Sequence, residues 1–231
     1  MSRAVWFFCL LPSLAIGSEV GGVRDSGFEA NAGYRVADDV ANLRAGGTFN
    51  YGLTDFLASG ISAQIGHTFG EDSVVDSDTV TVGADLFARK FELGKVGLGY
   101  FRTHSRFDVP VDDDSVDHNT YSAFAEYYMG QLTFKVSRQA LRSADVADFD
   151  AWSLGVAGYL SENTRLSVSG AGMDAADLYG VSVAHQPGWF QDKGSVSLAY
   201  SRSPDDDAVS LELNYFFGNK VSLRVRDREL R

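Results

Sequence analysis

The sequence predicts an all-β protein: a single antiparallel barrel of twelve strands that crosses a membrane. Three observations support this fold class. Apolar and polar residues alternate with a period of two along most of the chain, glycine is abundant at 24 residues against 4 prolines, and aromatic residues reach 13%. Such alternation indicates half-buried strands, and this composition suits many strands and tight turns better than helices.

The N-terminal segment predicts a cleaved export signal. Arg3 precedes an uncharged apolar run over residues 4–16, and positions 15 and 17 hold the small residues that a signal peptidase reads. The alternative is an N-terminal anchor helix, but a spanning helix needs roughly 20 apolar residues, more than this run provides. We expect residues 1–17 to be removed by cleavage after Gly17.

Removal of this segment would also remove the only cysteine, Cys9, and would change the net charge from −11 to −12 through loss of Arg3. An exported chain without thiols depends on burial and backbone pairing rather than on disulfides. Strong acidity argues against a nucleic-acid partner, because few cations are available to neutralise phosphates. The remaining chain has no apolar stretch approaching roughly 18 residues, which excludes a helical membrane protein.

Twelve segments have the length of about 9–11 residues that transmembrane strands need. One face of each segment is apolar, as at Val96 and Leu98, and the other is polar or small, as at Thr133 and Lys135. A soluble sandwich would alternate in the same way. The predicted strands lie near residues 28–37, 41–52, 57–68, 79–90, 95–106, 119–129, 131–142, 150–160, 164–173, 177–186, 194–203 and 207–217.

The connections favour a membrane barrel over a sandwich. Tight connections alternate with longer acidic ones, as short periplasmic turns alternate with external loops in outer-membrane barrels. This alternation places both chain termini in the periplasm. The tight set is residues 53–55, 91–94, 129–130, 161–163 and 188–193; the acidic set is 37–40, 71–78, 108–118, 143–150, 174–177 and 204–207.

Aromatic residues gather near the strand ends, which predicts two belts at the membrane interfaces. The alternative is ordinary core aromatics beside turns. Toward the acidic loops lie Phe69, Phe107, Tyr121, Trp152 and Tyr179, and toward the tight turns lie Tyr51, Phe56, Tyr127, Trp189 and Phe190.

The last strand carries Leu211, Leu213, Tyr215 and Phe217 on one face, and residues 51–55 read Tyr-Gly-Leu-Thr-Asp. With these two features the chain resembles the bacterial outer-membrane β-barrel proteins, in the broad small-porin sense. The resemblance covers residues 28–217 within a barrel domain of residues 18–217. It implies a Gram-negative outer membrane with its lipids and lipopolysaccharide as surroundings. It also implies that the last strand is the signal read by the barrel-assembly machinery.

The chain departs from the usual ending of such barrels, because residues 218–231 follow Phe217. We expect a basic periplasmic tail that folds back on the barrel. Val221, Leu223 and Val225 alternate, so a thirteenth strand is the alternative, but that number is unusual for a bacterial single-chain barrel.

The alternation also turns charged residues inward. A bare charge in a dry interior is costly, so these side chains must pair or meet water. One interpretation is a narrow aqueous pore with a charged wall, and the other is a salt-bridged plug that fills a small barrel. The candidates for the pore lining are Glu29, Arg35, Arg44, Asp85, Arg89, Glu126, Lys135, Arg165 and Glu212.

The acidic loops concentrate carboxylates at the outer surface, most densely at Asp112, Asp113 and Asp114. They lack the glycine and the spacing of an EF-hand loop, so a solvated acidic rim is expected rather than a calcium site. Such a rim would attract divalent cations that bridge lipopolysaccharide phosphates, or cationic solutes.

No catalytic or metal site is expected. His104 and Ser105 are adjacent, but neighbours on a strand point to opposite faces and cannot form a catalytic pair. The four histidines are scattered, and the glycines do not form a phosphate-binding motif.

The predicted function is a passive channel for small hydrophilic solutes or ions, with no cofactor. The alternative is a structural or interaction barrel with a closed lumen and acidic surface loops. A third interpretation is a lipid-acting barrel enzyme, which would need a Ser–His pair within hydrogen-bond reach on one face.

Overall fold

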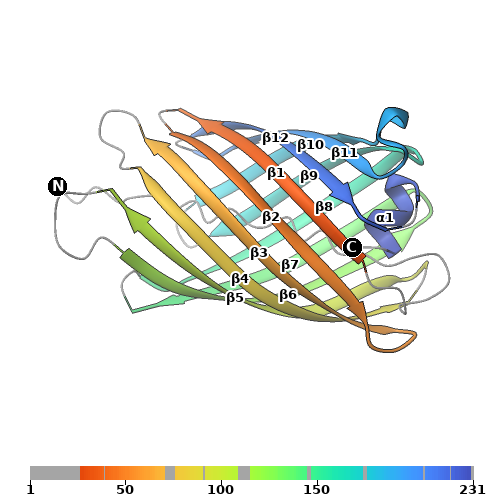
Figure 1. The fold of residues 1–231 in the computed structure, drawn as a ribbon, viewed down its shortest axis with the longest axis horizontal. Coiled ribbons are helices and arrows are strands. Elements are labelled where there is room, and N and C mark those ends of the chain that lie inside the picture. The colour runs from red at the N-terminus through yellow and green to blue at the C-terminus, as the bar shows by residue number, and fades with distance from the viewer. Residues whose placement is uncertain are drawn as a thin grey trace.

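The computed structural model describes residues 27–38, 40–70, 76–90, 92–108, 115–144, 147–173, 176–204, 206–218 and 220–229. They form a closed barrel in which each strand pairs antiparallel with its chain neighbours and the first strand pairs with the last (Figure 1). The strands are β1 (Gly27–Ala37), β2 (Val40–Gly52), β3 (Leu57–Gly70), β4 (Ser77–Lys90), β5 (Gly94–Phe107), β6 (Ser115–Met129), β7 (Leu132–Ser143), β8 (Phe149–Ser161), β9 (Thr164–Met173), β10 (Ala176–His185), β11 (Gly194–Arg202) and β12 (Asp207–Phe216).

The prediction of an all-β antiparallel barrel with twelve strands is confirmed, and the strand bounds differ from the predicted ones by a few residues. The largest shift is at β6, which begins at Ser115 rather than near residue 119. The described part of the tail, residues 218 and 220–229, forms no thirteenth strand. It contains a short helix, α1 (Leu223–Glu229).

The two ends of the barrel differ in their connections. We call the end with residues 53–56, 91–93, 130–131, 162–163 and 186–193 the turn end, and the opposite end the loop end. Two connections of the predicted long set are short, because strand pairing continues to the tip. Ala37 pairs with Val40, and Met173 pairs with Ala176. In the turn set, residues 186–193 are extended by the short helix η1 (Gly188–Phe190).

The outer face of the barrel is apolar. Its exposed side chains include Leu98, which is 66% exposed, and Val168 on β9. Burying so many large apolar residues from water requires a covering phase, and the bilayer interior provides one. The apolar face of each strand therefore points outward and the polar face points inward, which is the reverse of a soluble barrel.

Aromatic residues lie on the outer face near both ends. Tyr100 and Tyr121 pair toward the loop end with ring centroids 5.4 Å apart, and Phe28 and Phe217 pair toward the turn end at 5.5 Å. One predicted belt residue, Phe107, lies instead on the inner face. It is two positions after Ser105 on β5, which is buried on the inner face, and side chains two positions apart on a strand point the same way. Exposed members of the predicted belts are Phe69, Tyr121, Trp152, Tyr179, Tyr51, Phe56, Tyr127 and Trp189.

The helix α1 lies at the turn end (Figure 1). Its Leu223 is 1% exposed, so the helix is inserted against the barrel rather than extended from it. Among the described residues, no helix is long and apolar enough to cross a bilayer.

Candidate functional site: the charged interior

The inner face of the barrel holds the polar side chains. Arg44 on β2, for example, is flanked by the exposed outward residues Leu43 and Ala45, and Asp85 on β4 by Ala84 and Leu86. The same alternation places all nine candidate lining residues on the inner face. They come from β1, β2, β4, β6, β7, β9 and β12: Glu29, Arg35, Arg44, Asp85, Arg89, Glu126, Lys135, Arg165 and Glu212.

The first charge pair crosses the seam of the barrel. The Arg44 guanidinium lies 2.5 Å from the Glu212 carboxylate, and the Asn214 side-chain amide donates to the other Glu212 oxygen at 2.9 Å. Gly33 on β1 pairs with both Arg44 and Glu212 in the sheet. A Cβ at Gly33 would lie 2.7 Å from Arg44 Nε, so the absence of a side chain there lets Arg44 reach across β1 to β12.

A second group of charges surrounds Glu126 on β6. Its Oε1 lies 3.0 Å from Lys135 Nζ and 3.4 Å from Lys95 Nζ, and the Tyr128 hydroxyl lies 3.2 Å from Oε2. Lys95, Glu126 and Lys135 are direct neighbours in the register of β5, β6 and β7. The carboxylate thus compensates two cations in the barrel wall.

Lys95 was not among the candidate residues, although the sequence pattern predicts its position. It shares a face of its strand with Gly97 and Gly99, opposite the apolar Val96 and Leu98. The side chain is almost inaccessible at 2% and lies over two aromatic rings, 5.7 Å from the Phe87 centroid and 5.3 Å from that of Phe124. Cation–π attraction adds to the ion pair with Glu126 in holding this ammonium group inside the barrel.

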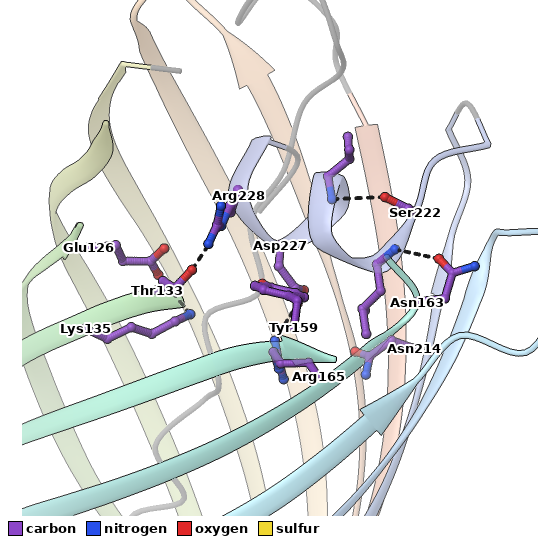
Figure 2. A network of polar contacts seen from close by, with 12 residues as sticks. Glu126, Thr133, Lys135, Tyr159, Asn163, Arg165, Asn214, Ser222, Asp227 and Arg228 are labelled. Atoms are coloured by element: carbon purple, nitrogen blue, oxygen red, sulfur yellow. Dashed lines mark hydrogen bonds and ion pairs between the residues drawn. The ribbon is translucent and has the colours of Figure 1, made fainter. Parts of the chain in front are cut away.

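The third group joins the barrel wall to the tail. Asp227 on α1 accepts from Arg165 Nη1 at 2.6 Å and from the Tyr159 hydroxyl at 3.1 Å (Figure 2). Arg228 donates to the Thr133 hydroxyl at 3.0 Å and lies over the rings of Tyr128 and Tyr159. Asp227 and Arg228 were not among the candidate residues, because nothing in the sequence places the tail inside the barrel.

Accessibility changes along the barrel axis. Toward the middle the inner face carries small residues that are exposed or half-buried, such as Ser167, Ser169 and Ser182. Toward the turn end, ten inner residues from strands all around the barrel are at most 7% exposed, although Lys135 and Arg165 at the same end keep side-chain exposures of 42% and 18%. The ten are Glu29, Asn50, Asp85, Arg89, Lys95, Tyr128, Thr133, Tyr159, Ser195 and Asn214. The interior is thus more accessible to water at its middle than at its turn end.

The loop end carries carboxylates, as the sequence suggested. Burial and the neighbouring Asp38 carboxylate raise the pKa of Asp206 above its ordinary range, and Arg35 opposes that shift. The densest part of the predicted acidic rim, Asp112, Asp113 and Asp114, lies outside the described residues, as does the predicted signal peptide.

The predicted assembly signal lies on the outer face of β12 and directly after it. Leu211, Leu213, Tyr215 and Phe217 are all exposed there, and the Phe217 amide donates to the Phe28 carbonyl oxygen at 2.8 Å. The final aromatic residue therefore extends the seam between the first and last strands.

The adjacent residues His104 and Ser105 point to opposite faces of β5. His104 is exposed and lies 2.9 Å from Asp117 Oδ1, whereas Ser105 is 2% exposed on the inner face. They cannot act together as a nucleophile and base. Within the described ranges, no group of three or more His, Cys, Asp or Glu residues is arranged to hold a metal ion.

Comparison with solved structures finds the same fold in outer-membrane channels. The chain is similar to the KdgM porin in complex with disordered oligogalacturonate, with a TM-score of 0.65 and 8% identity over 82% of this chain and 99% of that one. An outer membrane channel from Pseudomonas putida F1 gives 0.63 at 13% identity, over 89% and 99% of the two chains. CymD, a monoaromatic hydrocarbon channel, gives 0.54 at 10% identity, over 85% and 90%.

No family model matches the sequence, and no curated protein is similar to it at the sequence level. At these identities the structural likeness establishes the architecture and not the solute. The chain has the fold of the bacterial outer-membrane β-barrel porins and channels.

Proposed function

We propose that the protein is a passive channel in the bacterial outer membrane for small hydrophilic solutes or ions. The observation that carries the proposal is the inner wall, in which paired charges surround a mid-section of small, water-accessible residues such as Ser167 and Ser169. Such a wall offers solutes hydrogen bonds and charge in place of bulk water. The fold of the similar outer-membrane channels supports the same function.

In this proposal the turn end faces the periplasm and the acidic loop end faces outward, as in barrels with short periplasmic turns. The outer face contacts outer-membrane lipids, and the loop end contacts lipopolysaccharide. The exposed residues Leu211, Leu213, Tyr215 and Phe217 are read by the barrel-assembly machinery.

We further propose that the interior favours anions. The inner-face cations Arg35, Arg44, Arg89, Lys95, Lys135 and Arg165 outnumber the carboxylates Glu29, Asp85, Glu126 and Glu212. An excess of one sign on a narrow low-dielectric wall raises the local concentration of the opposite ion. The solutes that best fit this wall are small and negatively charged.

The channel function is tested by measuring ion selectivity, as the reversal potential, in planar bilayers. Replacing Arg44 with Glu places a second carboxylate beside Glu212, so we expect the reversal potential in a potassium chloride gradient to move toward cation preference. Arg138→Glu is the matched control, because Arg138 lies on the outer face with its side chain 71% exposed. An unchanged reversal potential in Arg44→Glu would contradict the lining role of Arg44.

A second candidate is a structural or interaction barrel with a closed lumen, and the low exposure of many inner residues at the turn end favours it. Its surface would act through the acidic loops, and its interior charges would serve only to fill the barrel. Purified protein that gives neither conductance nor liposome swelling, even without residues 218–231, would identify this function.

A further inference from the structure

The helix α1 is held at the turn end by three successive turns of the barrel. From the β6–β7 turn, the carbonyl oxygens of Gly130 and Leu132 each accept from Arg228 at 2.6 Å. From the β8–β9 turn, the Asn163 side chain accepts from the Leu223 amide at 3.2 Å. From the β10–β11 turn, the Lys193 carbonyl accepts from Arg226 at 3.1 Å. These bonds bind the helix to wall segments contributed by six strands.

The helix is inserted deeply enough that three of its residues are almost inaccessible to water. Leu223, Arg226 and Asp227 are 1%, 0% and 4% exposed. The inner residues that the helix contacts through Asp227 and Arg228, Tyr159 and Thr133, are 3% and 1% exposed. The tail therefore covers part of the β6–β11 side of the turn end.

On the opposite side, inward side chains of the wall pack against one another. There Phe87 packs with Ala58 and Phe124, and Lys95 lies over the rings of Phe87 and Phe124. All of these residues are on strands of the barrel. At the turn end, α1 is therefore the element best placed to move without breaking the pairing between strands.

The helix is suited to leave and return. It has only seven residues, and a helix of that length is not stable alone in water, so it keeps its shape only while docked. It is attached to the barrel by residues 217–222 after the last strand. Its contacts include hydrogen bonds and an ion pair, which can be exchanged for contacts with water or solute.

The contact that holds the helix has the chemistry of a carboxylate-binding site. Arg165 and Tyr159, neighbours in the β8–β9 register, both donate to a single oxygen, Asp227 Oδ2. An arginine guanidinium and a phenol converging on one carboxylate oxygen form charge-assisted hydrogen bonds. Any carboxylate that reached the position of Asp227 could accept the same bonds.

We propose that α1 is a built-in plug of the channel, and that Arg165 and Tyr159 form a carboxylate-binding site that Asp227 occupies in the closed state. Solutes that carry a carboxylate compete with Asp227 for this site and thereby release the plug. This inference rests on the proposed channel function and identifies carboxylates as the solute class that opens it.

The test compares conductance in planar bilayers for the full chain and two variants. Deletion of residues 218–231 leaves a chain that ends on Phe217, and we expect its conductance to exceed that of the full chain by at least about tenfold. Asp227→Asn keeps the helix but weakens its contact with Arg165, so it should raise the open fraction several-fold. Lys220→Gln is the matched control, since Lys220 is an exposed cation of the same segment, and should behave as the full chain does.

Carboxylate competition is tested by replacing chloride with acetate at equal ionic strength. Acetate should raise the open fraction of the full chain. Arg165→Gln has lost the site and its contact with Asp227, so its open fraction in chloride should already match that of Asp227→Asn, and acetate should not raise it further. Folding of each variant is checked by heat-modifiable gel mobility. The Asp227→Asn variant keeps the test valid if the deletion fails to fold.

The outcomes separate the plug from the channel. If the full chain conducts and neither the deletion nor Asp227→Asn increases conductance, the proposal that α1 is a plug is contradicted, whereas the proposed channel function is retained. If the plug opens in the variants but acetate acts equally on the full chain and on Arg165→Gln, the carboxylate site is wrong. If no form conducts or swells liposomes, the channel function fails and the plug fails with it.

Discussion

Replacing Glu126 with Ala should lower the free energy of unfolding by about 3–5 kcal/mol, because it removes a carboxylate that forms ion pairs with both Lys95 and Lys135 in this wall. The Glu126 side chain is 8% exposed and Lys95 2%, so water has little access to the Lys95 ammonium group that would lose its partner, whereas Lys135 is 42% exposed and can be solvated. The Tyr128 hydroxyl would also lose an acceptor. Urea unfolding of the barrel in phospholipid vesicles, followed by tryptophan fluorescence, measures this change.

The matched control is Asp150→Ala, which removes a carboxylate from exposed ion pairs with Arg138 and Arg142 on the outer face. Exposed pairs contribute little because water screens them. We expect no measurable change in the unfolding midpoint for this variant. Equal midpoint shifts in Glu126→Ala and Asp150→Ala would contradict a dry, charge-compensated wall at the turn end.

Replacing Leu98 with Arg should destabilise the barrel by about 2–4 kcal/mol, the cost of an arginine near the middle of the lipid face. Leu98 is 66% exposed on the outer face, between Tyr100 and the level of Tyr127, which pairs with Gly94 at the turn end of β5. The same vesicle unfolding assay measures the change. The effect should diminish in thinner bilayers, where the guanidinium reaches headgroups more easily.

Gln139→Arg is the control for Leu98→Arg. Gln139 pairs with Ser122 and Ala151 on the inner face, where the alternation places polar side chains. We expect a change well below that of Leu98→Arg, because an arginine there remains in a polar interior. If the inner substitution were the more costly one, the assignment of inside and outside would be reversed.

The fold was predictable because its determinants are local. Alternation specifies each strand, and a slip by one residue would turn Leu98 inward and Gly97 outward, so the register is strongly constrained. The two-residue hairpins at Ala37–Val40 and Met173–Ala176 were overestimated in length, since acidic residues at a strand end resemble a loop until their pairing is known.

The arrangement of charges was only partly predictable. Alternation is enough to put Arg44 and Glu212 on the inner face. Their contact depends on the pairing of the last strand, β12, with the first strand, β1, which closes the barrel. Lys95 was detectable from its parity and was overlooked. Ion pairs such as that of Lys95 with Glu126 depend on the register between neighbouring strands, which cannot be predicted from the sequence pattern alone.

The tail was the least predictable part. Val221, Leu223 and Val225 alternate as a strand would, yet residues 223–229 form a helix. In a free chain this segment has little preference for either state, and contacts with Asn163, Arg165 and the β6–β7 turn select the helix. Tertiary contacts that span 60 or more residues cannot be read from a local pattern.

The most direct test of the account labels two neighbouring positions of β9. The mature chain is expected to lack cysteine, so Val168→Cys and Ser169→Cys each introduce a single site for a fluorophore. In vesicles, the label at position 168 should be quenched by lipids brominated on the acyl chain and protected from aqueous iodide. The label at position 169 should show the opposite pattern, because the two side chains point to lipid and to a water-filled interior. Quenching of both labels by iodide and of neither by lipid would contradict the membrane barrel and the channel with it.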